Sequence, residues 1–266
     1  MATFEAFNRQ KACRHGQMLY NFHDTYVGRS LDLYGEYSEG EVELFRQILQ
    51  PGQFVVEAGA NIGAHTVFLA QHVGPSGAVM AFEPQRLVFQ TLCANLALNN
   101  IPNVICFNNA LGAEPGSARV PLINYWRESN FGAFALGGYQ EGEQVPVVTL
   151  DSLKLARCNF LKADVEGMEL QVLQGATDLI ARLKPIIYVE NDKSGKQLPL
   201  IRHVDGLGYR MYWHKPFYFN PTNFFGNQHD VFPQIVSLNM LCVPEELPLN
   251  VPGLEQVQIP PEEPGD

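Results

Sequence analysis

The sequence predicts an α/β domain in which helices cover both faces of a mostly parallel sheet. Short apolar runs alternate with segments of helical length, a pattern that is typical of parallel sheets. The first run, Phe54-Val55-Val56, leads into the acid Glu57 and a glycine-rich turn from Gly59 to Gly63. A second acid, Glu83, ends the next apolar run about twenty residues further along. A glycine turn and an acid at this spacing are how doubly wound folds bind a nucleotide-like cofactor.

The first half of the sheet is predicted in order along the chain. A helix begins at Ser38, a preferred N-cap residue, and ends before Pro51-Gly52. A later helix carries Pro84 in its first turn, where the missing N–H is tolerated. The predicted strands are 53–58, 78–83 and 104–107, and the predicted helices between them are 62–72 and 84–99.

The second half begins with residues 123–142, which are rich in Gly, Asn and aromatic residues and predict an inserted loop. Asp151 is expected to cap a helix. The remaining predicted elements are strands at 145–150, 160–163, 185–189, 209–213 and 235–242, and helices at 168–183 and 198–207.

Length and composition favour one globular domain. At 266 residues, of which 46% are hydrophobic, the chain can bury a full core. No apolar run approaches the roughly 20 residues that span a bilayer, and the N-terminus lacks the apolar core of a secretion signal. We therefore expect a cytoplasmic protein with no transmembrane segment. The net charge of −10 and the absence of a basic stripe predict no nucleic-acid partner.

Three regions are expected along the chain. Residues 1–37 form a polar and aromatic N-terminal extension, and residues 38–243 form the α/β domain. Residues 244–266 carry many acids and prolines but no Lys or Arg, which predicts an extended or disordered acidic tail. The five cysteines are widely scattered and no close Cys or Cys/His pair suggests zinc, so we expect them to be small core residues.

Polar residues end the predicted parallel strands, at the edge where ligands collect in such folds. Acids are rarely buried without a partner, so a row of them predicts a cationic or hydroxyl-rich ligand. Helix N-capping is the alternative for any single acid. The strand-end residues are Glu57, Glu83, Asn109, Asp164, Glu166, Glu190 and Asn191.

Several segments resemble the FkbM family of methyltransferases, over roughly residues 35–245. The most specific are the turn from Glu57 to Gly63 and the segment Lys162-Ala163-Asp164-Val165-Glu166-Gly167. The resemblance implies a class I methyltransferase fold, a Rossmann-like three-layer sandwich with a mostly parallel seven-stranded sheet and an antiparallel last strand. It also implies S-adenosylmethionine as methyl donor. Family members mostly methylate hydroxyls of sugars, glycolipids or other small natural products. Glu57 and Met168 depart from the family pattern, which usually has Asp and a smaller residue there.

The resemblance also implies roles for the residues of the turn and strand ends. Glu57 and the backbone of Gly59, Ala60 and Gly63 would face the methionine part of the cofactor, near Asp164. Glu83 would bind the ribose hydroxyls, and Asn109 the adenine. Asn61 would either bind the ligand or tolerate an unusual backbone angle.

Methyl transfer to a hydroxyl needs alignment and a base that removes a proton. Asp164 is the first candidate for this base, followed by Glu190 and Glu166. Asp164, Glu190 and Asn191 could alternatively hold Mg²⁺ through oxygen ligands, and the metal would then acidify the hydroxyl.

The acceptor is expected to be a small molecule or a glycan. Asn130 in the inserted loop, His214, Asn227 and His229 are candidates for its pocket, and nearby aromatic residues such as Trp213 and Tyr218 would suit stacking. Two other functions stay open. A nicotinamide-dependent oxidoreductase is disfavoured because the turn lacks the third glycine of the dinucleotide fingerprint. A module that binds the cofactor without catalysis is the other.

Overall fold

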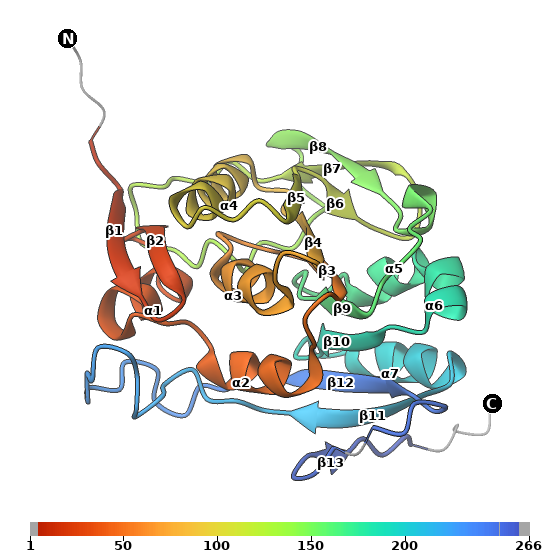
Figure 1. Ribbon diagram of the computed structural model, residues 1–266. Coiled ribbons are helices and arrows are strands. Elements are labelled where there is room, and N and C mark those ends of the chain that lie inside the picture. The colour runs from red at the N-terminus through yellow and green to blue at the C-terminus, as the bar shows by residue number, and fades with distance from the viewer. Residues whose placement is uncertain (1–4, 250, 261–266) are drawn as a thin grey trace.

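The computed structural model describes residues 5–249 and 251–260, and its centre is an eight-stranded sheet with helices on both faces (Figure 1). The strand order is β13-β11-β12-β10-β9-β3-β4-β5. The strands are β3 (Phe54–Ala58), β4 (Ala78–Phe82), β5 (Val104–Phe107), β9 (Phe160–Ala163), β10 (Ile186–Glu190), β11 (Tyr209–His214), β12 (Asn239–Pro244) and β13 (Glu255–Gln256).

The direction of the strands confirms the predicted fold class. The five strands from β5 to β10 pair in parallel, whereas β12 lies antiparallel to both β10 and β11. The predicted seven-stranded sheet with an antiparallel last strand is therefore present. The short strand β13 adds an eighth strand beside β11.

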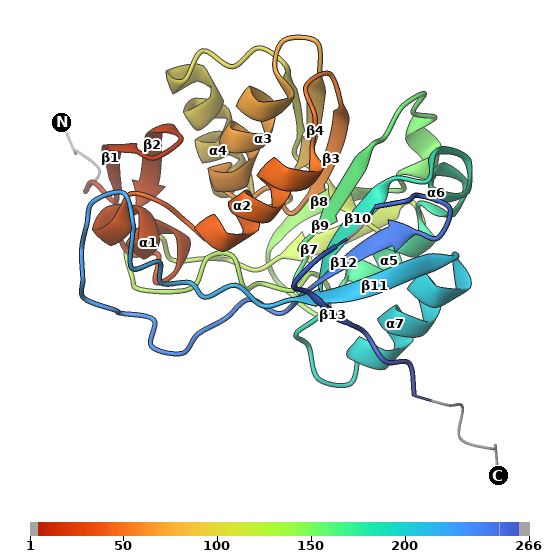
Figure 2. The ribbon, with the colours of Figure 1, turned by 60° about the horizontal axis from the view of Figure 1, so that its bottom comes forward.

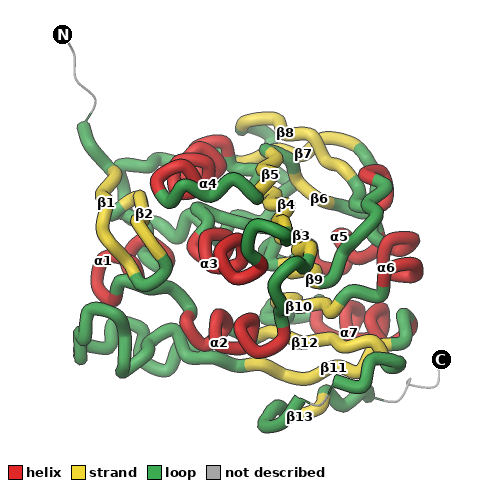
Figure 3. The backbone as a smooth tube through the Cα atoms, in the orientation of Figure 1, coloured by secondary structure: helices red, strands yellow, loops and turns green. Residues whose placement is uncertain are grey.

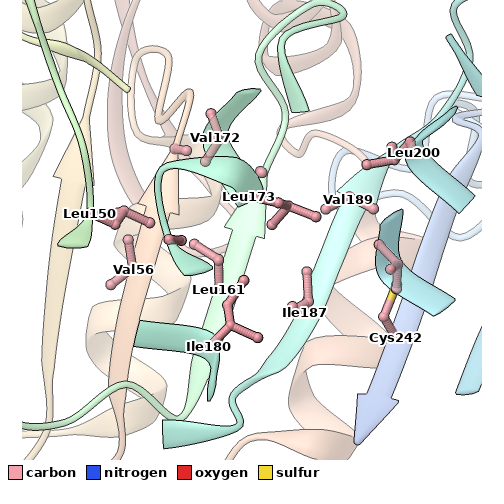
Figure 4. Close-up of a cluster of buried hydrophobic side chains, with 14 of the residues drawn as sticks. Val56, Leu150, Leu161, Val172, Leu173, Ile180, Ile187, Val189, Leu200 and Cys242 are labelled. Carbon is pink, nitrogen blue, oxygen red and sulfur yellow. The ribbon is translucent and has the colours of Figure 1, made fainter. Parts of the chain in front are cut away.

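Helices form the two outer layers, as Figures 1 and 2 show. One face is covered by α2 (Glu39–Ile48), α3 (Ala64–Val73) and α4 (Arg86–Leu98), and the other by α5 (Glu169–Gln174), α6 (Thr177–Leu183) and α7 (Gln197–Gly206). Alternate residues of each strand supply the two cores. Val55 and Tyr188 pack with α2 and α3, whereas Val56, Leu161 and Val189 pack with α5, α6 and α7 (Figure 4). Burial of both faces explains the nearly continuous apolar runs of these strands.

The helix predicted at 168–183 is two helices, and this prediction was wrong in its continuity. The chain breaks at Gly175-Ala176, between α5 and α6. A β-carbon at Gly175 would collide with the backbone carbonyl of Gly112, so close backbone packing requires glycine there. Asp151 begins a short 3₁₀ helix (Asp151–Leu153), but its carboxylate accepts hydrogen bonds from the N–H groups of Asp178 and Leu179. It therefore caps α6 rather than a helix of its own.

Smaller elements differ from the sequence prediction at their boundaries. Pro84 lies before α4, whose N-cap is Gln85. Ser38 is the N-cap of α2, but its hydroxyl donates to the Glu41 carboxylate instead of accepting from the backbone. The strand predicted at 235–242 begins only at Asn239. The strand predicted at 145–150 is β8 (Glu143–Val148), which forms a separate sheet with β6 (Ala110–Leu111) and β7 (Gly116–Val120).

The N-terminal extension is folded onto the domain. It forms a hairpin of β1 (Asn8–Cys13) and β2 (Gly16–Asn21), followed by α1 (Val27–Tyr34). The buried Asn95 side chain of α4 bonds both the N–H and the carbonyl of Leu19 in this hairpin. The long loop at 215–238 lies beside α1 in Figures 1 and 3, and its Phe225 N–H donates to the Tyr34 carbonyl.

The tail predicted from residue 244 is described up to residue 260, except for residue 250. It runs along β11, and Val257 is buried there. Residues 261–266 lie outside the described part of the chain. Among the described residues, no helix combines the length and the apolar character that crossing a bilayer requires.

Candidate functional site

Two adjoining pockets lie at the carboxyl ends of the parallel strands. One, the polar pocket, is lined mainly by acids and tyrosines, and the other, the apolar pocket, by side chains such as Phe82, Leu111 and Phe134. Both pockets extend to the glycine turn, so one elongated ligand can occupy the two together. The residues that line both are Gly59, Glu83, Gln85, Gly132, Asp164 and Glu166.

The glycine turn joins β3 to α3 and forms the floor between the pockets. Gly59 and Gly63 have φ of +80° and +86°, and a β-carbon at Gly59 would collide with the backbone carbonyl of Asp164. Asn61 also has a positive φ of +51°, and its side chain accepts a hydrogen bond from the N–H of Ile62. The Asn61 side chain therefore stabilises the turn itself, which favours the backbone interpretation of this residue.

Glu83 connects the turn to the end of β4. Its carboxylate accepts hydrogen bonds from the backbone N–H groups of Asn61 (2.9 Å) and Gln85 (2.8 Å). Burial raises the pKa of Glu83 to about 7 despite these two bonds. The carboxylate is thus fixed at the junction of the pockets. Asn109 lines the apolar pocket nearby.

A buried lysine lies beneath the acids of the polar pocket. Lys162 of β9 is 2% exposed, and its Nζ lies 3.2 Å from the Asp164 carboxylate. Burial alone would lower the pKa of Lys162, but Asp164, Glu57 and Glu41 raise it above its usual range. Burial in turn raises the pKa of Glu57 to about 7, although the Thr66 hydroxyl donates to its carboxylate at 2.6 Å. Lys162 therefore forms an ion pair with Asp164, and the charges of Glu57 and Glu41 also favour its protonated form.

Sequence reasoning missed Lys162 and Glu41 as members of the site. The signal was present, because a lysine inside the apolar run from Phe160 to Ala163 must find partners when the strand is buried. In the sequence, Glu41 stands out only as an acid in the first turn of α2, where a negative charge is favourable. The structure shows that it is 4% exposed and lines the polar pocket.

The catalytic candidates Asp164, Glu166 and Glu190 come together at the rim of the polar pocket. Each offers a carboxylate oxygen, and these oxygens lie within 4.8 Å of one another. Lys193 forms ion pairs with Glu166 (2.9 Å) and Glu190 (3.4 Å). Burial raises the pKa of Glu166 to about 7, and burial together with the charges of Asp164 and Glu166 raises the pKa of Glu190.

Asn191, predicted as a third metal ligand, does not join this group. Its side chain is buried against Met240 and lies near the Gln197 carbonyl, in a different pocket. Asn191 directly follows Glu190 at the end of β10. Neighbouring residues of an extended chain point to opposite faces, so the two side chains enter different pockets. Glu166, rather than Asn191, joins Asp164 and Glu190 in the group of neighbouring carboxylates.

Three tyrosines from segments far apart in the sequence cover the polar pocket. The ring centroid of Tyr218 lies 5.6 Å from that of Tyr26 and 5.8 Å from that of Tyr37. The inserted loop contributes Asn130 and Gly132 to the lining. We call these tyrosines and loop residues the roof. The roof is tied to the turn by Gln85, whose amide donates to the Phe131 carbonyl.

Three predicted acceptor residues lie outside both pockets. His214 bonds the Tyr188 hydroxyl at 2.8 Å, and burial lowers its pKa to about 4. It lines a separate groove beside α2. Asn227 stabilises a turn by accepting from the His229 N–H, and His229 is exposed. Of the four candidates Asn130, His214, Asn227 and His229, Asn130 alone lines the polar pocket, and Tyr218, which was expected to stack against the acceptor, lines it as well.

The residues present suit S-adenosylmethionine. An apolar slot beside a fixed carboxylate fits a nucleoside, and an acid-rich pocket fits a group with positive charge. Gln85 adds a buried carbonyl oxygen, Oε1, that has no hydrogen-bond partner among the described residues and lies where the pockets meet. A bound donor group would satisfy this oxygen.

Comparisons with known proteins agree with this site. The family model described as "Methyltransferase FkbM domain" matches residues 57–211. The chain is 30% identical over 147 residues to "Methyltransferase 1" of Beauveria bassiana (strain ARSEF 2860), a match covering 47% of this chain and 59% of that protein. It is 26% identical over 165 residues to "Methyltransferase sdnD" of Sordaria araneosa, covering 49% and 62% respectively. The match therefore spans about three fifths of each relative's length.

A solved structure of the methyltransferase FkbM from Methylobacillus flagellatus KT superposes with a TM-score of 0.49 at 19% identity. That superposition covers 75% of this chain and 50% of the other.

Proposed function

The chain belongs to the FkbM methyltransferase family, and we propose that it is an S-adenosylmethionine-dependent O-methyltransferase. Its acceptor would be a hydroxyl of a sugar, a glycolipid or another small natural product. The observation that carries the proposal is the pair of buried carboxylates, Glu57 and Glu83, on either side of a turn that requires glycine at residue 59.

The residues of the two pockets suggest where the cofactor would be held. Glu83 would bind the ribose, and Asn109 would lie beside the adenine in the apolar pocket. Glu57 and the turn from Gly59 to Gly63 would face the methionine part. When bound, the cofactor supplies an electrophilic methyl group on a sulfonium, and the oxygen–methyl bond forms as the sulfur–methyl bond breaks.

Asp164 is the residue that we propose to take the proton of the acceptor hydroxyl. It lines both pockets, and the Lys162 ammonium at 3.2 Å holds its carboxylate in place. A positioned general base typically contributes about 10²–10⁴-fold to the rate. Glu190 and Glu166 are the next candidates, because their carboxylates share the rim with Asp164.

A Mg²⁺-assisted reaction is the alternative for deprotonation. Asp164, Glu166 and Glu190 could supply oxygen ligands, but Lys193 already forms ion pairs with two of them. We therefore propose that the carboxylates act without a metal. Turnover should persist in EDTA, and a requirement for added Mg²⁺ would assign the metal to this rim.

Calorimetry separates the proposed enzyme from its alternatives. We expect S-adenosylmethionine and S-adenosylhomocysteine to bind, and NAD to give no measurable heat. Tight binding of NAD instead would favour the nicotinamide-dependent oxidoreductase. Formation of S-adenosylhomocysteine with a panel of hydroxyl acceptors would distinguish the enzyme from a module that only binds the cofactor.

A further inference from the structure

The polar pocket has more carboxyl groups than cationic groups among the described residues. Six carboxylates line it, from Glu41, Glu57, Glu83, Asp164, Glu166 and Glu190, against the single ammonium of Lys162. Lys193 adds a second ammonium through its ion pairs at the rim. The methionine end and the sulfonium of the proposed cofactor bring two positive charges and one negative charge. The cofactor alone therefore leaves more carboxyl groups than cations in the pocket, and burial together with the charges of Asp164 and Glu166 keeps the pKa of Glu190 raised.

Buried acceptor atoms without a partner line the same pocket. Gln85 is 5% exposed, and its amide N–H donates to the Phe131 carbonyl, which leaves Oε1 as an unpaired acceptor. His65 is also 5% exposed, and its Nε2 has no partner among the described residues. Burial lowers the pKa of His65 well below its usual range, so the ring is neutral. Its Nε2 can then accept a hydrogen bond from a ligand. Oε2 of Glu190 likewise has no hydrogen-bond partner beyond its ion pair with Lys193.

Gln85 Oε1, His65 Nε2 and Glu190 Oε2 would be satisfied by a ligand that donates hydrogen bonds. Such a ligand is favoured because buried polar groups without partners cost free energy. One unpaired donor, Nδ2 of Asn239, lines the pocket as well and pairs in register with Glu190. A ligand oxygen beside the donating group would satisfy it. The ligand therefore needs several N–H or O–H donors and at least one acceptor oxygen.

Tyrosine rings of the roof add a further preference. Tyr26, Tyr37 and Tyr218 line the pocket together with the strand-end acids, and the electron-rich faces of such rings attract cations. All three lie outside residues 57–211, the segment that the family model matches. The three tyrosines therefore come from the segments that flank the matched region. Residues from such segments are suited to selecting the acceptor.

We propose that the acceptor is an amino alcohol, with a protonated amine next to the hydroxyl that is methylated, and that Glu190, Tyr26 and Tyr218 bind the amine. This inference rests on the proposed function and narrows its acceptor to amine-bearing sugars and related compounds. The ammonium supplies the missing positive charge and the donors, and the hydroxyl oxygen supplies the acceptor for Asn239.

A matched pair of small probes tests the proposal. trans-2-Aminocyclohexanol and trans-cyclohexane-1,2-diol differ only in an ammonium against a hydroxyl. Both would be titrated by NMR into the full chain saturated with S-adenosylhomocysteine, at neutral pH. We expect the amine to bind at least about tenfold more tightly, the range for a hydrogen bond to a charged group.

Two variants assign the preference to the pocket. Glu190→Gln keeps the shape and removes the carboxyl group that would pair with the ammonium, so the preference for the amine should vanish. Measurable S-adenosylhomocysteine binding by this variant would show that the pocket is still folded. Glu43→Gln, on the exposed face of α2, is the control and should keep the preference. If the unmodified chain binds the amino alcohol less than about threefold more tightly than the diol, the inference is overturned. No measurable binding of the amino alcohol would overturn it too. Loss of S-adenosylhomocysteine binding by the unmodified chain would instead overturn the proposed function.

Discussion

At the scale of single residues, Lys162 explains how so many acids tolerate burial at one edge of the sheet. A buried ammonium is costly alone, and so is each buried carboxylate. Placed together, Lys162 and the carboxylates of Asp164, Glu57 and Glu41 attract each other, whereas the carboxylates repel one another and outnumber the cation. The excess fits a site whose ligand brings positive charge.

Replacing Asp164 tests the proposed base. We expect Asp164→Asn to lower turnover by about 10²–10⁴-fold, because the amide cannot accept the hydroxyl proton. The affinity for S-adenosylhomocysteine, measured by calorimetry, should change by less than about tenfold. That limit corresponds to roughly 1.4 kcal/mol of binding free energy. Asp178→Asn on α6 is the control, since Asp178 lines neither pocket. Turnover retained by Asp164→Asn would transfer the role to Glu190 or Glu166.

Glu57 predicts a pH dependence of stability. Burial raises its folded-state pKa from 4.5 to about 7, so the stability it contributes is complete below 4.5 and is lost as pH rises through 7. The shift corresponds to roughly 3 kcal/mol. We expect Glu57→Gln to gain stability relative to the unmodified chain as pH rises from about 5 to about 8. Urea unfolding of both ligand-free proteins measures this, and parallel pH profiles would contradict it.

Sequence reasoning identified the parts of the site that follow a strand directly. Glu57, Glu83 and Asp164 lie at the edge of the sheet where the sequence placed them, because the carboxyl ends of parallel strands meet at one edge. Sequence reasoning placed His214 and Asn227 in the acceptor pocket, but both lie outside it. A position at a strand end or in a loop does not show which way the side chain points. Tyr26 and Tyr37 could not be predicted as neighbours of Tyr218, because only tertiary folding brings these segments together.

At the scale of elements, α6 depends on a cap from outside its own sequence. Its N-cap position is Ala176, which offers no side-chain acceptor, and Asp151 supplies one from the preceding 3₁₀ helix. The carboxylate accepts from two N–H groups at distances of 3.0 and 2.8 Å. A tertiary contact therefore replaces the local cap that the sequence pattern suggested.

Removal of this cap should destabilise the fold without affecting the pockets. We expect Asp151→Ala to cost about 0.5–2 kcal/mol, the usual range for an N-cap. Thermal unfolding should show a fall in Tm of roughly 2–4 °C per kcal/mol for a chain of this size. Asp205→Ala, exposed near the end of α7, is the comparison and should change stability by less than about 0.5 kcal/mol.

The order and type of the main strands and helices were largely predictable from the sequence. Apolar runs of strand length that alternate with helical segments define a parallel sheet, and the structure confirms it. The break at Gly175 and the separate sheet of β8 were not predictable, because both depend on contacts with residues distant in the chain. Gly175 packs on Gly112, and β8 pairs with β6 and β7.

At the scale of the whole molecule, both terminal segments extend the domain, at different places. The N-terminal segment reaches the polar pocket through Tyr26 and Tyr37, whereas the C-terminal segment packs along β11. The acidic composition of residues after 244 suggested a tail free of the domain. Val257 shows why part of it is held, since it is buried and its N–H donates to the Met211 carbonyl.

Deletion of residues 251–266 should separate stability from binding. We expect a loss of about 1.5–3 kcal/mol, the value of burying one valine side chain, measured by urea unfolding. S-adenosylhomocysteine affinity should stay the same, because none of residues 251–260 lines the polar or the apolar pocket. A change in affinity above about tenfold would show that the C-terminal segment acts on the cofactor site.

The tyrosines and the strand-end residues of the polar pocket come from separate stretches of the chain, so the two sets can be recombined. Glu57, Lys162 and Asp164 come from the central segment, whereas Tyr26, Tyr37 and Tyr218 come from stretches before and after it. Grafting the flanking stretches of another family member onto this scaffold would exchange one selectivity for another while leaving the methyl-donor machinery in place. Catalysts with new preferences could then be assembled by domain shuffling rather than by rebuilding the reaction centre.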